Sequence, residues 1–506
     1  MSILGRRTDY SDMKFPSAHT VLLIIAALVA GITWFLPSGQ YDRLVYDSTT
    51  NEFRISGESE KSMPATQESL DDIGVKIPLE NFTEGDIWKP IGIPGTYHKT
   101  TSKPQGIIDF FQAPLKGIEE AIDIILFVLI LGGAIGVVHS TGAFDAGVIS
   151  LSNVLKGREF LLIIIITSLI AAGGTTFGLA EETIAFYPIL VPVFLAAGYD
   201  AMVAIACIYI GSSIGTMAST VNPFSVIIAS DSAGINWITG IQGRVMMLFI
   251  GLSLCLWYIL RYARKVKKDP STSLIYEQKE ELEERFLQKK GAERKLLTGR
   301  QKFILIVFAL CFVVMIYGVS SLEWWFLEMT TVFFCGAILM GFIAKTGEKA
   351  FVKSFINGAK DLLSVALIIG VARGITILME QGQISDTLLY QSSLAVDGMP
   401  KGLFIGMLYV VYTGLSLFIS SSSGMAVLTM PIFAPLADVV GIGRELIVNA
   451  YMYGQGLFAF INPTGLILAS LTVVNVGFNK WLKFIMPLVT MLAFLGLLAL
   501  IAGTYF

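Results

Sequence analysis

Two Asn-Pro dipeptides, Asn222-Pro223 and Asn462-Pro463, stand inside apolar stretches in opposite halves of this 506-residue chain. Proline has no backbone N–H and clashes with the preceding helical turn, so each dipeptide should interrupt a helix that otherwise crosses a bilayer. The flanking residues also match, because Asn222-Pro-Phe-Ser-Val-Ile-Ile-Ala-Ser230 reads against Asn462-Pro-Thr-Gly-Leu-Ile-Leu-Ala-Ser470. We interpret the copies as parts of an internal duplication, although prolines at one helix position can also be simple kinks.

Two further landmarks support the duplication. Pro188-Ile-Leu-Val-Pro192 precedes the first Asn-Pro as Pro431-Ile-Phe-Ala-Pro435 precedes the second, and turns around Gly142 and Gly382 stand further upstream. Duplicated halves with interrupted helices near the middle of the bilayer are typical of secondary transporters, in which the interruptions form the substrate site.

Composition independently indicates a membrane protein. Hydrophobic residues make up 54% of the chain and charged residues only 15%, more apolar material than a soluble core can absorb. The predicted fold class is accordingly an all-α polytopic membrane protein. The cysteines all lie inside apolar stretches, so we expect neither disulfides nor a metal cluster; they are Cys207, Cys255, Cys311 and Cys335.

Charge predicts the orientation of the chain. Residues 1–37 contain an apolar run, 19–36, that is too long for a signal-peptide core and is interpreted as a retained first helix. Three basic residues precede that run: Arg6, Arg7 and Lys14. The polar segment 38–104 holds more acidic than basic residues, whereas the linker 263–302 is net basic. By the positive-inside rule, the N-terminus and the linker lie in the cytoplasm and 38–104 lies outside.

Tracing the chain between these anchors predicts nine full crossings and two doublets. The crossings are 19–36, 122–140, 201–234, 245–262, 303–319, 325–344, 362–378, 446–474 and 482–501, and the doublets are 160–197 and 403–439. The first repeat, 105–262, then starts outside and the second, 347–506, starts inside, with 303–346 as an extra scaffold pair. The repeats are therefore predicted to be inverted about an axis in the membrane plane.

Each doublet could be two full spans or a re-entrant hairpin, because both return the chain to its starting side. The turns at 173–178 and 420–424 are small, polar and flexible. Non-helical backbone at membrane depth is tolerated only where it lines a cavity or packs in protein. These turns therefore favour two re-entrant hairpins that face the two broken helices.

Helix ends at such interruptions suit an anionic group, because N-terminal N–H groups and the positive end of the helix dipole point toward it. Unwound carbonyls can instead ligate a cation, so sodium near Asn222 and Asn462 is a second possibility. Hydroxyl groups also commonly bond their own helix. The candidate substrate-binding residues are Thr175, Thr176, Ser219, Thr220, Asn222, Ser225, Ser421, Ser422, Ser423, Asn462 and Thr464.

Three ionisable residues stand out against the apolar background, where a charge costs several kcal/mol and is a functional candidate. Glu181 and Glu182 follow the first turn, and could cap the next helix, accept a coupling proton or sodium, or pair with a cationic substrate group. Arg373 lies in the centre of an apolar span. It should pair either with a buried carboxylate, such as Glu380 or a hairpin glutamate, or with a substrate carboxylate.

Four motifs carry a resemblance to a known family: Lys14-Phe-Pro-Ser-Ala-His-Thr-Val-Leu-Leu, Phe-Gly-Leu-Ala-Glu-Glu at 177–182, Gly-Tyr-Asp at 198–200 and Asn-Pro-Phe-Ser at 222–225. The chain resembles the YfcC branch of the DcuC-type anaerobic carriers over nearly its whole length. That family belongs to the ion transporter superfamily and includes four-carbon dicarboxylate carriers and arginine/ornithine exchangers. The resemblance implies a homodimeric elevator transporter in the bacterial cytoplasmic (inner) membrane.

The chain departs from the sodium-coupled dicarboxylate branch of that superfamily, whose hairpins carry matched Ser-Asn-Thr tips. Neither tip contains asparagine here, which counts against sodium coupling by that arrangement. The glutamate pair is also unfavourable for a doubly anionic substrate, because like charges repel strongly in a poorly solvated site. It favours an amino acid, especially a basic one, or a protonatable coupling site.

The sequence therefore predicts a secondary active transporter of small carboxylate-bearing solutes, with amino acids ahead of four-carbon dicarboxylates. The expected partners are the solute, the lipid bilayer and a second copy of the chain, with no nucleic acid and no cofactor beyond a coupling H+ or Na+. An ion channel is the alternative from another class. Three histidines and no recognisable nucleophile, metal or phosphate-binding motif leave little basis for an enzyme.

Overall fold

The computed structural model describes residues 17–505, apart from 58–59, 86, 88–89, 145, 148–149, 151–157, 288–296, 323 and 397. The basic residues Arg6, Arg7 and Lys14, on which the orientation prediction rests, lie outside the described residues, as does part of the linker 263–302. The first helix, α1 (Ala18–Ile32), ends four residues before the predicted boundary at 36.

Within the described ranges, eight helices are long and apolar enough to cross a membrane. They are α5 (Ile122–Ser140), α7 (Phe160–Phe177), α11 (Ile241–Lys268), α13 (Gly299–Ser321), α14 (Phe326–Ala344), α16 (Leu363–Gln381), α19 (Ser422–Val440) and α22 (Phe478–Gly503). The predicted polytopic helical membrane fold is confirmed. The number of crossings, their direction and the predicted domain limits stay predictions.

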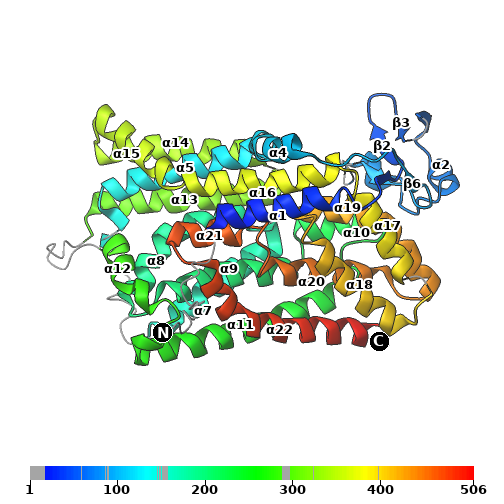
Figure 1. Cartoon of the computed structure of the whole chain (residues 1–506). Helices are drawn as coiled ribbons and strands as arrows, with labels where there is room; N and C mark the ends of the chain where they lie inside the picture. Colours follow the sequence, from blue (N-terminus) through cyan, green and yellow to red (C-terminus); the bar gives the residue numbers. More distant parts are fainter. Residues whose placement is uncertain are drawn as a thin grey trace, which may run out of the picture.

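The helices form two layers that run roughly parallel to one another (Figure 1). One layer, here called the α16 layer, contains α1, α5, α13, α14 and α16 together with two shorter helices, α4 (Ile107–Glu120) and α15 (Glu348–Asp361). The other, the α9 layer, is built around α9 (Ala201–Met217) and α20 (Arg444–Ala459), and also contains α7, α11, α18 (Lys401–Leu415), α19 and α22. Most extensive helix packing occurs within a layer.

Glycines permit the closest packing inside each layer. A Cβ atom on Gly117 of α4 would lie 2.1 Å from the carbonyl oxygen of Gly370 in α16. A Cβ on Gly215 of α9 would lie 2.4 Å from the carbonyl oxygen of Ala171 in α7. Small residues let helix backbones approach in this way in membranes, where burial of apolar surface supplies little driving force. Each layer is therefore a tightly packed unit.

Two helix pairs turn back inside the molecule, as the sequence predicts. In the first pair, α7 ends at a left-handed residue, Gly178, and the chain returns through a 3-10 helix, η2 (Glu181–Phe186), and α8 (Tyr187–Ala196). In the second pair, α18 is followed by a non-helical turn and α19. Figure 1 shows the pairs entering from opposite ends, α8 near α12 (Lys279–Phe286) and α18 near the strands.

Two further helices are interrupted at the Asn-Pro dipeptides. The first interruption follows α9, and the chain resumes as a π-helical turn, η3 (Pro223–Ile227), and α10 (Ile228–Ser232). The second separates α20 from α21 (Ile467–Val474). Each proline follows its asparagine where the helical hydrogen bonds have already stopped, which agrees with its missing N–H. The prediction of two broken helices is confirmed.

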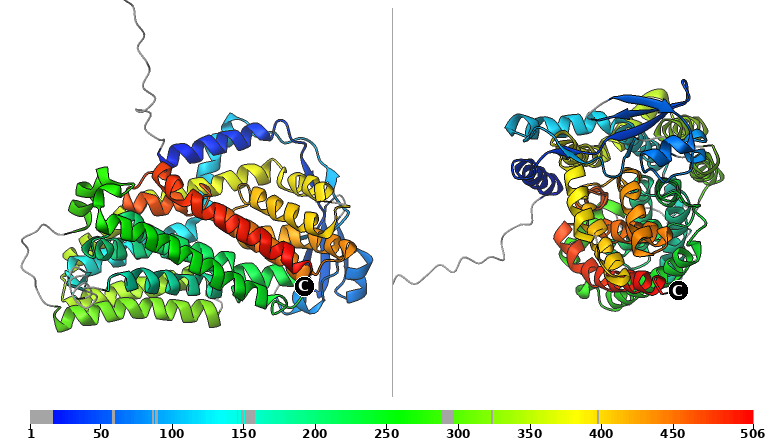
Figure 2. Two further views of the ribbon diagram at one scale, coloured as in Figure 1. Left: turned by 90° about the horizontal axis from the view of Figure 1, so that it is seen from below. Right: turned by 90° about the vertical axis from the view of Figure 1, so that its right-hand side faces the viewer.

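The polar segment 38–104, for which the sequence made no secondary-structure prediction, contains short strands. Strands β2 (Arg43–Asp47), β3 (Glu52–Ser56), β4 (Lys61–Pro64) and β5 (Ile91–Gly92) form a sheet in the order β4-β3-β2-β5, and β1 (Gly39–Gln40) pairs with β6 (His98–Lys99). Two short helices, α2 (Gln67–Asp72) and α3 (Glu80–Thr83), complete it. The end-on view in Figure 2 shows this segment lying across one end of the helical layers.

Candidate functional site

A cavity of about 500 Å³ lies between the two layers, where the helix pairs and the interruptions meet. The α9 layer contributes both turns and both Asn-Pro interruptions to its wall, and the α16 layer contributes α4, α5, α14 and α16. The sequence-predicted site residues that line it are Glu181, Glu182, Asn222, Ser225, Arg373, Ser421, Ser422, Ser423, Asn462 and Thr464.

The two asparagines occupy equivalent positions in their halves. The side-chain oxygen of Asn222 accepts from the backbone N–H of Phe224 at 2.9 Å, and that of Asn462 accepts from the N–H of Thr464 at 3.0 Å. Each amide group donates to the last turn of the first helix in the preceding pair: Asn222 Nδ2 to the carbonyl of Gly174 at 3.4 Å, and Asn462 Nδ2 to the carbonyl of Ser416 at 3.0 Å. Each asparagine thus joins a broken helix to the helix pair of its own half.

Four predicted residues do not line the cavity. Thr175 and Thr220 bond to each other, the N–H of Thr220 donating to Thr175 Oγ1 at 3.0 Å. Ser219 is fully buried and accepts from Ser225 Oγ at 3.0 Å. Thr176 is exposed on the other face of α7 and donates to the carbonyl of Ala172 in its own helix at 2.6 Å. These hydroxyl groups therefore form hydrogen bonds around the first interruption or within their own helix.

The first turn presents two carboxylates to the cavity. Glu182 Oε2 accepts from the backbone N–H of Ala180 at 3.1 Å, so this glutamate folds back on its own turn. Neither Glu181 nor Glu182 forms an ion pair with any basic residue in the described part of the chain. The helix that follows is a 3-10 turn whose N-terminal end is already occupied by these acidic residues. The first turn is therefore a negative surface of the cavity.

The second turn has the opposite polarity. Ser421 is the N-cap of the 19-residue helix α19, and its hydroxyl accepts from the N–H of Gly424 at 3.1 Å. Ser422 Oγ donates to the carbonyl of Phe224, which ties this turn to the first interruption at 3.1 Å. The first turn of a helix carries N–H groups without intrahelical partners and the positive end of the dipole. The second turn therefore offers hydroxyl and N–H donors to an anionic group.

Arg373 pairs with a different carboxylate from those the sequence suggested. Its Nη2 atom contacts Glu120 Oε1 at the end of α4, and neither Glu380 nor a hairpin glutamate is its ion-pair partner. Both side chains of this pair line the cavity and are partly exposed there, by 30% and 40%. Arg373 therefore has a carboxylate partner, but its ion pair is formed with Glu120, which the sequence analysis did not name, whereas Glu380 interacts with Arg373 electrostatically without an ion-pair contact.

Sequence reasoning missed several lining residues. Polar side chains of the α9 layer stand on helical faces toward the cavity: Tyr209, Ser212, Ser213, Thr216, Ser416 and Gln455. Aromatic residues of the α16 layer close the opposite side: Trp324, Trp325 and Phe326. Small hydroxyl residues inside an apolar helix look like residues that bond their own backbone, as Thr216 does, so no local signal marks the ones that face a cavity.

The lining carries an excess of negative charge. Among the residues that the structure describes, its carboxylates are Glu120, Asp123, Glu181 and Glu182, and its single cationic side chain is Arg373. A dianion would therefore meet net repulsion, whereas a cationic group would be attracted. Among the described residues, no group of three or more His, Cys, Asp or Glu side chains is placed to hold a metal ion.

Comparison with other sequences gives related matches along the whole chain. A family model described as DcuC, the C4-dicarboxylate anaerobic carriers, matches residues 15–505. An uncharacterized protein of Haemophilus influenzae is 45% identical over 491 residues, which cover 96% of each chain. The Escherichia coli protein YfcC, whose name proposes a basic amino acid antiporter, is 29% identical over 508 residues, covering 96% of this chain and 95% of its own.

Two solved transporter structures are similar at low sequence identity. The Alcanivorax borkumensis YdaH transporter is 14% identical, with a TM-score of 0.39 over 96% of this chain and 98% of its own. Neisseria gonorrhoeae MtrF is 15% identical, with a TM-score of 0.40 over 98% of this chain and 96% of its own.

Proposed function

Because the chain belongs to the DcuC family of C4-dicarboxylate anaerobic carriers, we propose that this membrane transporter is a secondary active carrier of small carboxylate-bearing solutes, and that amino acids, basic ones first, are its substrates. The observation that carries the proposal is the opposite polarity of the two turns in one cavity. Glu181 and Glu182 stand at one turn, and the first turn of α19 stands at the other. An amino acid has charged groups of both signs and can satisfy both turns at once.

The site would bind the substrate carboxylate at the serine-rich turn and its cationic group at the glutamates. Charge-assisted hydrogen bonds of both kinds are stronger than neutral ones, and they gain further strength in a cavity partly closed to water. The glutamate that does not hold the substrate would accept the coupling proton or sodium ion. Trp324 and Trp325 stand in the lining as aromatic faces that a cationic side chain can approach.

The transport step would be an elevator movement of the α9 layer against the α16 layer. The α9 layer holds both turns and both interruptions, so a solute bound to them would travel with it as one unit. The α16 layer would remain in place and form the contact between two copies of the chain in the bacterial inner membrane, with the N-terminus in the cytoplasm. This division follows the packing of the helices, which is denser within the layers than between them.

A four-carbon dicarboxylate is the second candidate substrate, because the family description names that class. The cavity argues against it, since four carboxylates and one arginine line the wall and a dianion would add two further negative charges. A dicarboxylate would need Arg373 released from Glu120 or at least one protonated glutamate.

Counterflow in proteoliposomes separates the two substrate classes. Vesicles containing the purified protein are loaded with unlabelled arginine, ornithine, alanine, glutamate or succinate, and uptake of each labelled solute is followed with and without sodium or a pH gradient. We expect saturable exchange that is fastest for the basic amino acids. Saturable exchange of succinate without any amino acid exchange would contradict the proposed substrate class, and conductance without saturation would indicate a channel.

A further inference from the structure

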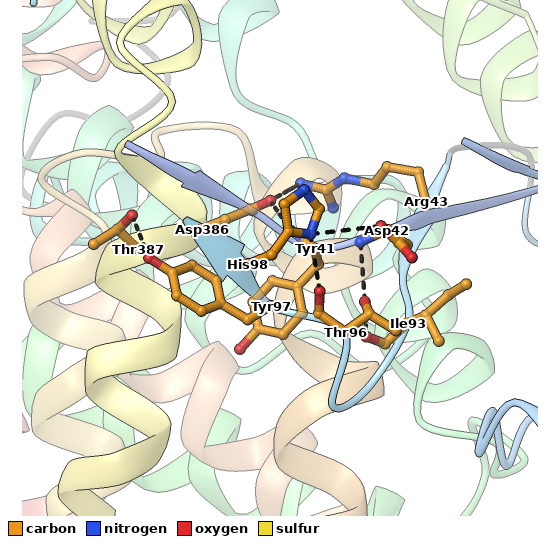
Figure 3. Close-up of polar contacts among 9 residues, drawn as sticks. All are labelled: Tyr41, Asp42, Arg43, Ile93, Thr96, Tyr97, His98, Asp386 and Thr387. Carbon is orange, nitrogen blue, oxygen red and sulfur yellow. Dashed lines mark hydrogen bonds and ion pairs between the residues drawn. The ribbon is translucent and has the colours of Figure 1, made fainter. Parts of the chain in front are cut away.

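Basic side chains at the two ends of the molecule have different surroundings. At the end that carries the strands, Arg43 Nη2 donates to both carboxylate oxygens of Asp386 in α17 (Ser385–Val396), at 2.6 and 2.7 Å, and Asp386 is only 5% exposed (Figure 3). At the opposite end, where α11 ends and α22 begins (Figure 1), five exposed basic residues form no ion pair within the described ranges. These five residues, here called the basic rim, are Arg261, Arg264, Lys265, Lys268 and Lys483.

The two helices that carry the basic rim pack against each other beside it. The ring of Phe484 in α22 lies against that of Tyr262 in α11, with centroids 4.9 Å apart. The carbonyl of Phe484 also accepts from the hydroxyl of Tyr258. Arg261 directly precedes Tyr262 and Lys483 directly precedes Phe484, so the basic residues of both helices lie around one contact.

The nearby carboxylates are engaged by other groups. Lys267 Nζ stands 3.1 Å from Glu159 Oε2, and Lys480 Nζ stands 3.7 Å from Glu277 Oε2. The carboxylate of Asp269, which follows α11, accepts two hydrogen bonds within its own turn. The basic rim therefore carries a positive charge that no ion pair of the described chain balances.

The basic rim continues an exposed apolar face of α11. Met246 is 55% exposed, Phe249 67% and Trp257 48%. Residues that are three, four or seven positions apart share one face of a helix, so this apolar face leads directly to Arg261 and Lys268.

The same order occurs on α22. The exposed Lys483 in the first turns of this helix is followed on one face by three exposed apolar residues: Met486, Phe494 and Leu498. Because α22 starts where α11 ends, both helices present positive charge at one end and an apolar surface beyond it.

The spacing along α11 matches one leaflet of a bilayer. From Met246 to Trp257 the helix rises about 16 Å, which is close to half of a hydrocarbon core roughly 30 Å thick. Tryptophan is enriched at the boundary between that core and water. Arg261 lies one turn further, with its Cζ atom 5.6 Å from the centroid of the Trp257 ring. Long basic side chains extend from such a position toward the headgroups, so the basic rim can reach the phosphate layer.

We propose that the basic rim binds the phosphate group of an anionic phospholipid whose acyl chains lie along the exposed faces of α11 and α22. A soluble anion would use only the charges, whereas a phospholipid uses the charges and the apolar faces in the order in which they occur. The general excess of positive charge on the cytoplasmic side does not require that charge to share a face with exposed apolar residues. Each basic residue at an anionic membrane surface strengthens binding about fivefold, and three together about 100-fold.

Lipid binding to the purified full-length protein in a neutral detergent tests the proposal. Native mass spectrometry measures the apparent Kd of phosphatidylglycerol, of phosphatidylcholine with the same acyl chains, and of glycerol 3-phosphate. We expect phosphatidylglycerol to bind at least tenfold more tightly than the other two ligands. The combined substitutions Arg261→Gln, Lys265→Gln and Lys483→Gln should weaken its binding about 100-fold.

A matched variant removes the same charge from paired residues at the same end: Lys267→Gln, Lys279→Gln and Lys480→Gln. Its affinity for phosphatidylglycerol should stay within about threefold of the wild type, because these side chains lie outside the basic rim. Equal weakening in the two triple variants would overturn the proposal, since net charge and not the basic rim would then determine binding.

Two further outcomes would also contradict a phospholipid site. Equal affinity for phosphatidylglycerol and phosphatidylcholine would remove the role of the charges, and equally tight binding of glycerol 3-phosphate would make a soluble anion the ligand. Arg261→Lys with Lys265→Arg and Lys483→Arg keeps the charge and should retain the wild-type affinity; a loss as large as in the glutamine variant would overturn the proposal. Binding is measured without transport, so these results are independent of the proposed function.

Discussion

The two turns that meet in the cavity occupy equivalent places in the inverted halves, yet they carry opposite polarity. The first turn contains Glu181 and Glu182 and leads into a 3-10 helix. The second contains four lining serines and begins a 19-residue α-helix at Ser422. The backbone of the duplication is conserved between the halves of this molecule, as the two asparagines show, whereas the charge is not. An inverted repeat can therefore keep a symmetrical framework and still bind an unsymmetrical solute.

The largest expected effect tests the negative turn. Glu181→Gln removes one of the two carboxylates that the first turn presents to the cavity, so we expect the KM for a basic amino acid to rise about 10- to 100-fold, the loss of one charge-assisted hydrogen bond. Glu182→Gln keeps an oxygen that can accept from Ala180 and tests the second carboxylate separately. Uptake kinetics of both variants are compared with Asp123→Asn, a lining carboxylate of the other layer that should stay within about twofold. Unchanged kinetics in both glutamate variants would remove the pair from the site.

The next effect concerns the charge on the opposite wall. Glu120→Gln leaves Arg373 without its ion-pair partner, and we expect the ratio of anionic to basic solute uptake to rise roughly tenfold. Arg373→Gln should shift the same ratio in the other direction. The double variant is the control, since removing both charges should bring selectivity back toward the wild-type value. If both single variants shift the ratio in the same direction, the pair acts through folding and not through charge.

Sequence alone predicted the parts of this comparison that are encoded locally. A proline within an apolar run identifies an interrupted helix without any knowledge of its neighbours, and Gly178 can adopt the left-handed conformation at the first turn. The partner of Arg373 could not be identified in the same way, because Glu120 is 253 residues away in the chain. The two glutamates in the sequence indicated the negative charge of the first turn, which is one half of the opposite polarity of the two turns. The cavity position of Ser212 and Gln455 required the packing of α9 against α20.

A smaller and symmetrical effect is expected at the two asparagines. Asn222→Ala removes the N-cap of η3, Asn462→Ala removes the acceptor of the Thr464 N–H, and each also removes one bond to the neighbouring helix pair, so each should lower the free energy of unfolding by about 1–3 kcal/mol. Substrate binding should weaken in both, because the interruption moves away from the cavity. Thermal melting and substrate titration of the purified variants measure the two effects, with the exposed Asn479→Ala as the control. A large loss in one half only would show that the framework is less symmetrical than the hydrogen bonds indicate.

The smallest expected effect distinguishes hydroxyl groups that line the cavity from those that only form a hydrogen bond to their own helix. Thr176→Val at the first turn removes a hydroxyl that is exposed outside the cavity and bonded to its own helix, so stability should change by no more than about 0.5 kcal/mol and transport should stay unchanged. Ser422→Ala at the second turn removes the bond to the Phe224 carbonyl, worth about 0.5–1.5 kcal/mol, beside the proposed carboxylate site. We therefore expect the KM to rise several-fold only for Ser422→Ala. An equal rise for Thr176→Val would place the substrate against α7, and the second turn would then no longer be the single anionic-group site.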